Sequence, residues 1–166
     1  MTLGSFDSLV RALDGAHVRY LVAGGLAVNA HGYLRFTRDV DLVLQLGRAN
    51  ILSAFGALER IGYRPLVPVS AEDFANETKR DGWVRDKGMV VLNFWSELHQ
   101  QTPIDVFVTE PFDFDQEYMR ALVKPLGAVV VRFVSIPTLI RMKEVAGRPQ
   151  DRIDIEYLRK VSDVGK

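Results

Sequence analysis

The chain contains no cysteine, which excludes disulfide bonds and thiolate metal sites. It also lacks an apolar run of the roughly 20 residues that span a bilayer, so no membrane partner is predicted. The start of the chain has neither a basic stretch nor a following apolar segment, which predicts that no signal peptide is present. Without these features, a cytoplasmic location is the default expectation.

An excess charge of one sign is absent as well, because 21 basic residues balance 21 acidic ones. Proteins that hold long duplex DNA by electrostatic attraction are usually basic, so this balance argues against that class. The three histidines, His17, His31 and His99, do not have the spacing of zinc ligands. A local basic groove remains compatible with the balanced total.

Apolar residues are plentiful: they make up 48% of the 166 residues. That content argues against disorder and supplies one domain of ordinary size with a core. We therefore predict a single domain over residues 1–166 whose C-terminal segment, 136–163, is helical. Ser5 and Asn50 are predicted to cap two earlier helices. Hydrophobic periodicity predicts helices over 6–13, 26–31, 51–62 and about ten residues from Ser70, and strands over 18–23, 39–46, 63–69, 89–95, 104–108 and 127–134.

A glycine pair follows the first predicted strand. Gly24 and Gly25 have no Cβ, so they permit a sharp turn and a close approach of the backbone to a ligand. The short helix predicted next would present unpaired N–H groups and a partial positive charge at its N-terminus, which suits a triphosphate. Taken alone, a glycine pair is more often only a turn.

Two carboxylates open the second predicted strand. Asp39 and Asp41 are two residues apart, so they share one face of the strand at about 7 Å, while Val40 and Leu42 point to the core. Hard oxygen ligands at this separation suit Mg²⁺ or Mn²⁺, with phosphates and waters in the remaining positions. Two-metal phosphoryl chemistry normally needs a third carboxylate. The alternative is an ordinary half-solvated strand.

Asp105 is the candidate for that third carboxylate. It interrupts an otherwise apolar strand, where a lone acid is costly to bury unless it is paired or bound to a metal. If this strand lies beside the one carrying Asp39 and Asp41, three carboxylates converge. The alternative is that Asp105 lies at an exposed edge.

Basic residues precede the acids in Arg35-Phe-Thr37-Arg38-Asp39. Because arginine forks suit phosphate oxygens, Arg35 and Thr37 are candidate nucleotide contacts. Arg38 is a weaker candidate, since it alternates with Asp39 and faces away. A structural ion pair between Arg35 and a nearby acid is an equal alternative.

The C-terminal segment carries a further charged set. Pro137 marks the first turn of a helix, and residues 147–149 break it. On the next helix Asp151 and Asp154 lie three residues apart on one face. Lys143 could reach nucleotide phosphates, with Asp151 or Asp154 positioning it. An ion-pair set on the surface of two packed helices is the alternative.

Together, the strand, Gly24-Gly25, the helix, Arg35-x-Thr37-x-Asp39-x-Asp41 and a later strand aspartate resemble the DNA polymerase β-type nucleotidyltransferase superfamily. The run from Gly24 to Asp41 is most similar to its small bacterial branch of AbiEii-like abortive-infection toxins. Many members have serine where this chain has Gly25, which removes one phosphate contact. The resemblance implies an α/β (α+β) nucleotidyltransferase fold, with a mixed twisted sheet that carries the three aspartates on one face and helices on the other.

The resemblance also implies a function. The implied reaction is Mg²⁺- or Mn²⁺-dependent transfer of a nucleoside monophosphate from ATP or another NTP to a hydroxyl group. The acceptor would be tRNA, other RNA, a protein or a small molecule. The branch also implies that the protein could be a toxin with an antitoxin partner. The alternatives are a catalytically silent member that binds nucleotide or protein, and an antibiotic-modifying nucleotidyltransferase. The implied residues are Asp39, Asp41 and Asp105 for metal and catalysis, and Gly24, Gly25, Arg35, Thr37, Lys143, Asp151 and Asp154 for the nucleotide.

Overall fold

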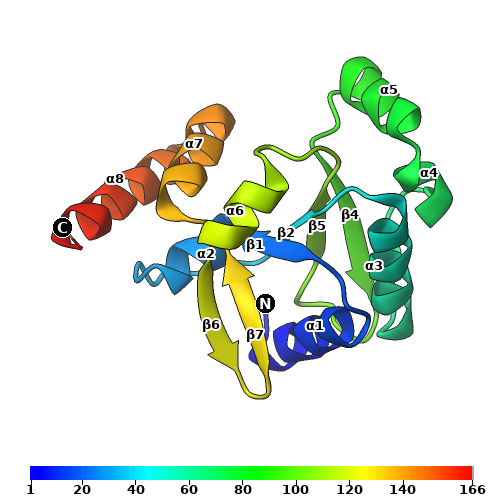
Figure 1. Ribbon diagram of the computed structural model, residues 1–166, viewed down its shortest axis with the longest axis horizontal. Helices are drawn as coiled ribbons and strands as arrows, with labels where there is room; N and C mark the ends of the chain where they lie inside the picture. The colour runs from blue at the N-terminus through cyan, green and yellow to red at the C-terminus, as the bar shows by residue number, and fades with distance from the viewer. Residues whose placement is uncertain (166) are drawn as a thin grey trace.

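The computed structural model describes residues 1–165 and contains a seven-stranded mixed sheet in the order β3-β4-β5-β2-β1-β7-β6 (Figure 1). This confirms the mixed α/β architecture expected from the sequence. The strands are β1 Tyr20–Ala23, β2 Val40–Leu44, β3 Tyr63–Pro65, β4 Val91–Ser96, β5 Ile104–Phe107, β6 Leu122–Leu126 and β7 Val129–Phe133. The helices are α1 Leu3–Gly15, α2 Gly24–Ala30, α3 Arg48–Arg60, α4 Ala71–Ala75, α5 Glu77–Lys87, α6 Phe114–Arg120, α7 Ile136–Ala146 and α8 Pro149–Val164.

The centre of the sheet is formed by β1, β2 and β5. β1 and β2 are antiparallel, with Ala23 opposite Asp41, and β2 and β5 are parallel, with Asp41 opposite Asp105. Because side chains alternate along a strand, these two acids share one face, and Val40 and Val106 lie on the other face with no exposed surface. The register therefore separates an acidic face from an apolar face in the middle of the sheet.

The apolar face belongs to one continuous core. It joins the buried sides of α1 and α3, represented by Leu9 and Ile51, with strand residues such as Leu42 and Ile104. The spacing of these helix residues is that of one face of an amphipathic helix, which is why the sequence pattern found both helices. Burial of this face fixes the orientation of β2 and β5 and thereby directs their aspartates to the opposite side.

The C-terminal helices form a separate layer. In Figure 1, α7 (orange) and α8 (red) lie together at the left, beyond α2, and α4 and α5 (green) lie at the far right. Gly147, with φ +64°, and Pro149 end one helix and begin the next, as the sequence predicts. None of the described helices combines the length and apolar character that crossing a membrane requires.

Several predicted boundaries differ from the structure. Thr2, rather than Ser5, caps α1, since its hydroxyl accepts the Ser5 N–H at 3.2 Å. Asn50 lies inside α3, where its amide ties the backbone of Arg19 to the helix instead of capping it. The helix predicted from Ser70 is two helices, because Asn76 takes an extended conformation and caps the second one.

Two elements were not predicted at all, namely α6 and β6. The strand predicted over 63–69 is limited to Tyr63–Pro65 at the edge of the sheet, where prolines 65 and 68 stop further pairing. β6 forms the opposite edge and pairs only with β7. Neither edge strand contributes to the centre that carries the aspartates.

Candidate active site

The three predicted acids are brought to one face of the sheet. Asp41 and Asp105 are direct neighbours in the parallel β2–β5 ladder. The backbone N–H of Val40 donates to the Pro103 carbonyl at 3.0 Å, so the two chains still run side by side where Asp39 precedes β2. All three acids are partly buried. Asp105 is therefore not an edge residue. It lines one cavity together with Asp41, whereas Asp39 is not among the residues that line that cavity.

Burial and mutual repulsion dominate the electrostatics of these acids. Burial, together with the charges of Asp105 and Asp39, raises the pKa of Asp41 to about 7, against the opposing charges of Lys143 and Arg148. Burial also raises the pKa of Asp105, although a hydrogen bond from Asn93 Nδ2 to Asp105 Oδ1 at 2.6 Å opposes this. Carboxylates held in this way favour a bound proton or a bound cation.

The donor chemistry fits a hard divalent cation. Within residues 1–165, no group of three histidine, cysteine, aspartate or glutamate side chains is placed to enclose a metal ion. Asp41 and Asp105 instead offer oxygen donors on one side only, which leaves the other positions to water and phosphate oxygens. This is the manner in which Mg²⁺ is commonly held beside a nucleotide. The site thus fits Mg²⁺ or Mn²⁺ bound together with a triphosphate better than it fits a metal bound alone.

Gly24 is required by the position of Asp41. Its φ of +62° is unfavourable for other residues, and a Cβ there would lie 1.9 Å from Asp41 Oδ2. The sharp turn expected from the glycine pair is present. However, α2, which begins at this turn, has only seven residues, so its dipole is a modest source of positive charge. Side-chain cations must supply most of the positive potential.

Gly25 packs against the loop that precedes β2. A Cβ at this position would lie 2.6 Å from Thr37 Oγ1 and 3.2 Å from Arg35 Nη1. The Thr37 hydroxyl therefore takes the space that a side chain at position 25 would need. This packing explains why position 25 is a glycine, and it leaves the Thr37 hydroxyl at the turn.

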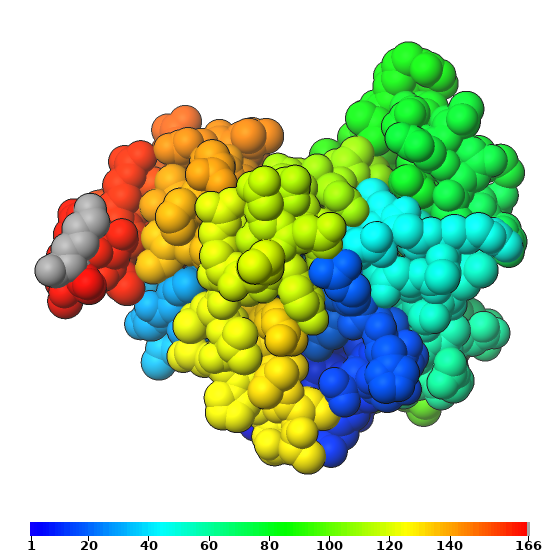
Figure 2. All heavy atoms as spheres, in the orientation of Figure 1, coloured from blue at the N-terminus to red at the C-terminus, as the bar shows by residue number. Residues whose placement is uncertain are grey.

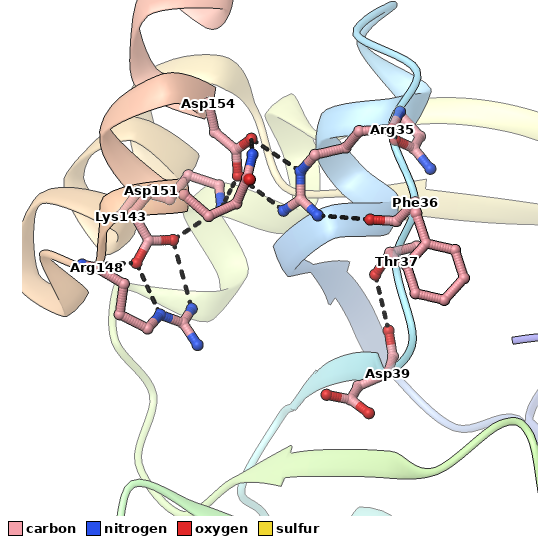
Figure 3. A network of polar contacts seen from close by, with 10 residues as sticks. Arg35, Phe36, Thr37, Asp39, Lys143, Arg148, Asp151 and Asp154 are labelled. Carbon is pink, nitrogen blue, oxygen red and sulfur yellow. Dashed lines mark hydrogen bonds and ion pairs between the residues drawn. The ribbon is translucent and has the colours of Figure 1, made fainter.

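Buried ion pairs join this loop to α7 and α8 (Figure 3). Both oxygens of Asp154 accept hydrogen bonds at 2.8 Å from Arg35, through Nε and Nη2. Lys143 Nζ lies 2.7 Å from Asp154 Oδ2 and 3.2 Å from Asp151 Oδ1. Lys143, Asp151 and Asp154 are at most 4% exposed, so this set is not a surface ion-pair cluster.

Hydrogen bonding determines the charge state of the two C-terminal acids. Burial alone would raise the pKa of Asp154, but hydrogen bonds from Arg35 and Lys143 lower it below its usual range. The pKa of Asp151 is lowered in the same way, against burial, by hydrogen bonds from Arg148 and Lys143. Both acids are therefore ionised at neutral pH. Arg35 is committed to Asp154, which is the structural ion pair that the sequence left as an alternative.

Two residues of the site were not identified from the sequence. Arg148 lies between α7 and α8, where its Nε donates to Asp151 Oδ2 at 2.8 Å and its charge lowers the pKa of Asp41 and Asp105. Asn93 lies on β4 opposite Asp105. The position of Arg148 directly before a helix-starting proline and three residues before Asp151 was a usable signal. No local signal pointed to Asn93.

A cavity of about 830 Å³ connects these groups. Gly24, Asp41 and Asp105 line it from the sheet, and Lys143 and Arg148 line it from α7 and the start of α8. In Figure 2, the orange surface of α7 and the green surface of α5 stand on either side of a notch in the molecule. The cavity places acids and cations on facing walls, as binding of a metal–triphosphate complex requires.

Comparison with known proteins supports the fold. No protein-family model and no curated protein sequence matches the chain. The crystal structure of the lincosamide antibiotic adenylyltransferase LnuA, with lincomycin bound, is similar at a TM-score of 0.62 and 14% identity, over 97% of this chain and 98% of LnuA. The solution structure of the antibiotic-resistance factor ANT(2'')-Ia gives a TM-score of 0.58 at 17% identity, over 97% of this chain and 82% of that one.

ANT(2'')-Ia in complex with adenylyl-2''-tobramycin is also similar, with a TM-score of 0.56 and 13% identity over 96% of this chain and 91% of that chain. Similarity at such low sequence identity establishes the fold. The AbiEii-like branch stays a prediction, since these three structures are of proteins described in connection with antibiotic modification or resistance. The chain has the nucleotidyltransferase fold.

Proposed function

We propose that the protein is a metal-dependent nucleotidyltransferase, which transfers a nucleoside monophosphate from an NTP to a hydroxyl group. The observation that carries this proposal is the pairing of Asp41 with Asp105 across two parallel strands, at the cavity that also receives Lys143 and Arg148. LnuA is described as an adenylyltransferase, and ANT(2'')-Ia was solved with an adenylylated product, which supports the same chemistry here.

The reaction assigns a role to each acid. The acceptor oxygen attacks the α-phosphorus, the bond to the bridging oxygen of the β-phosphate breaks, and pyrophosphate leaves. The acceptor proton passes to Asp105, whose pKa is raised by burial, so that this carboxylate accepts a proton more readily than a solvated one. Asp39 and Asp41, with Asp105, would hold Mg²⁺ or Mn²⁺. When bound, the metal neutralises charge on the phosphates.

The cations hold the triphosphate. Lys143 uses two of its N–H donors on Asp151 and Asp154, so among the described residues one donor remains for a phosphate oxygen. Arg148 has a side chain that is 74% exposed and lies at the same cavity, so it can turn to the departing pyrophosphate. Gly24 lines the cavity from the sheet side, and Gly25 and Thr37 lie next to it, so these residues would offer backbone N–H groups and a hydroxyl to the triphosphate. Arg35, Asp151 and Asp154 position these groups.

A small molecule is the acceptor that the observations favour. LnuA, whose structure contains lincomycin, is similar to this chain over 97% of this chain and 98% of LnuA. The neutral net charge also speaks against capture of a long nucleic acid. An acceptor RNA such as tRNA, or a protein, together with a toxin role and an antitoxin partner, is the second candidate. It rests on the resemblance of the run from Gly24 to Asp41 to AbiEii-like proteins.

Label transfer tests the proposal. The protein is incubated with Mg²⁺, each α-labelled NTP and separate pools of antibiotics, total tRNA and cell protein. We expect one pool to be labelled, and Asp41→Asn to reduce the rate at least about 1,000-fold, because the buried carboxylate then no longer binds the metal. Asp86→Asn, the same change at an exposed position of α5, is the matched control and should leave the rate unchanged.

Two results would contradict the proposal. If no pool is labelled although Mg²⁺–NTP binds, the protein is a silent, nucleotide-binding member of the fold. If Asp41→Asn transfers label as fast as the wild type, the acids do not act through a metal.

A further inference from the structure

The cavity continues beyond the acids along the acidic face of the sheet. Phe107 follows Asp105 by two residues on β5, so both side chains lie on the same face at about 7 Å. Val91 is the direct partner of Phe107 on β4. Both residues line the cavity. The sheet side of the cavity therefore changes from a carboxylate at Asp105 to an apolar surface at Phe107, two residues further along β5.

The facing wall of this part of the cavity is apolar too. It is formed by α7, from which Leu139, Met142 and Val145 line the cavity. Val145 is 91% exposed, and Val90, at the rim on the sheet side, is 63% exposed. Exposed apolar side chains on both sides of a hollow release water when an apolar group enters between them. We call this part, lined by Val90, Val91, Phe107, Leu139, Met142 and Val145, the apolar compartment.

Charges around the apolar compartment disfavour a polycation. The acids that line the cavity are Asp41 and Asp105, which serve the metal, and Asp151, which Lys143 and Arg148 already neutralise. Arg141 adds a positive charge to the same lining. A ligand with several positive charges would find no uncommitted carboxylate among the described lining residues and would be repelled by the arginines.

A second cavity of about 490 Å³ does contain further acids. Glu77, Asp81 and Glu110 line it, but Arg80 lies among them and Glu110 accepts the Leu46 N–H at 2.9 Å. It shares only Thr109 with the main cavity. A group held there lies outside the apolar compartment.

We infer that the apolar compartment receives the acceptor, and that the acceptor is a small molecule with an apolar face beside its reactive hydroxyl and at most one positive charge. The inference rests on the proposed function, because the hydroxyl must reach Asp105 and the molecule that carries it then extends over Phe107 and Val91. Apolar contact, rather than ion pairing, selects the acceptor.

Calorimetry with two acceptor probes tests this inference. The protein is first loaded with Mg²⁺ and α,β-methylene-ATP, and the dissociation constant of that complex is recorded. Lincomycin, a sugar amide with an alkyl-bearing ring and a single amine, is then compared with tobramycin, which carries several amines. We expect lincomycin to bind at least about ten-fold more tightly, as apolar burial predicts.

Val145→Glu places a carboxylate at the mouth of the apolar compartment without loss of helix propensity. It should weaken lincomycin binding about ten-fold, strengthen tobramycin binding and leave the affinity for the ATP analogue unchanged. Val164→Glu is the matched control, because Val164 is 87% exposed on α8 and does not line the cavity. It should change neither probe.

The outcomes are separable. Wild-type protein that fails to bind Mg²⁺ and the ATP analogue refutes the proposed function, and the inference falls with it. If the analogue binds but lincomycin does not, or tobramycin binds as tightly, only the inference about the acceptor is wrong. If Val145→Glu weakens the ATP analogue instead, the apolar compartment holds the nucleobase and the inference is also wrong.

Discussion

Replacement of Asp41 by asparagine should make the metal-free protein more stable while it abolishes activity. The folded protein holds this carboxyl at a pKa of about 7, compared with 3.8 in a solvated chain. Between these values the folded state binds more protons than the unfolded state, so stability falls as the pH rises. Above about pH 7 the carboxyl is ionised in both states, and the unfolding free energy is lowered by the whole difference that corresponds to the two pKa values.

The magnitude follows from the difference between the two pKa values. It corresponds to about 4 kcal/mol for a carboxylate fully shielded from water. Because Asp41 is only partly buried, water screens some of the repulsion, and we expect about 2–4 kcal/mol. Asparagine has nearly the same shape without the charge. For a chain of this length, the gain corresponds to a melting temperature higher by about 5–10 °C.

Thermal unfolding followed by circular dichroism in EDTA measures this effect. The Asp41→Asn variant should exceed the wild type at about pH 8, and the difference should shrink towards about pH 5, where the wild-type carboxyl is largely protonated. With Mg²⁺ and an NTP present, only the wild type should gain further stability. A variant that is less stable than the wild type at about pH 8, or a difference that does not change with pH, would refute the assignment of Asp41 as a buried, repelled carboxylate.

Two other substitutions test the glycine turn and the buried ion pairs. Gly24→Ala should lower the unfolding free energy in urea by about 1–3 kcal/mol more than Gly88→Ala and should abolish Mg²⁺–ATP binding. Gly88 has nearly the same φ, +61°, but a Cβ added there would meet no atom within 4 Å, so the comparison isolates the clash with Asp41. Equal losses of stability in the two variants would contradict this clash. Asp154→Ala should cost about 3–5 kcal/mol because it leaves Arg35 without a carboxylate partner and the buried Lys143 with Asp151 alone. Glu156→Ala, which removes an exposed ion pair on the same helix, should cost less than about 0.5 kcal/mol. If Asp154→Ala and Glu156→Ala lose the same stability, burial does not strengthen the Asp154 ion pairs.

The sequence was most informative where local pattern and burial agree. The order of strand, glycine turn, helix and Asp39-Val40-Asp41 was predictable because a strand with one buried face must alternate. Asp105 could be proposed from the cost of burying a lone acid, but its pairing with Asp41 depends on strand order, which the sequence does not specify. Asn93 could not be identified for the same reason, because its position opposite Asp105 depends on which strands are neighbours.

Edge elements and long-range ion pairs were not predictable. β6 contains Lys124 and Pro125 and has no buried residue, so it shows no alternation and forms only because β7 pairs with it. α6 has only seven residues, too few for a clear periodicity. The spacing of Asp151 and Asp154 indicated a shared face, but nothing local indicated that Arg35 would bind there.

The bond between Arg35 and Asp154 joins residues 119 positions apart, and this separation has a consequence during synthesis. A chain emerges from the ribosome with its N-terminal part first, so β1, α2 and β2 are complete long before α8 exists. Until α8 emerges, Arg35 and Lys143 have no carboxylate partners, and the proposed triphosphate site cannot assemble. Translation that stops before α8 is therefore expected to yield a protein that contains all three proposed catalytic acids but has no activity.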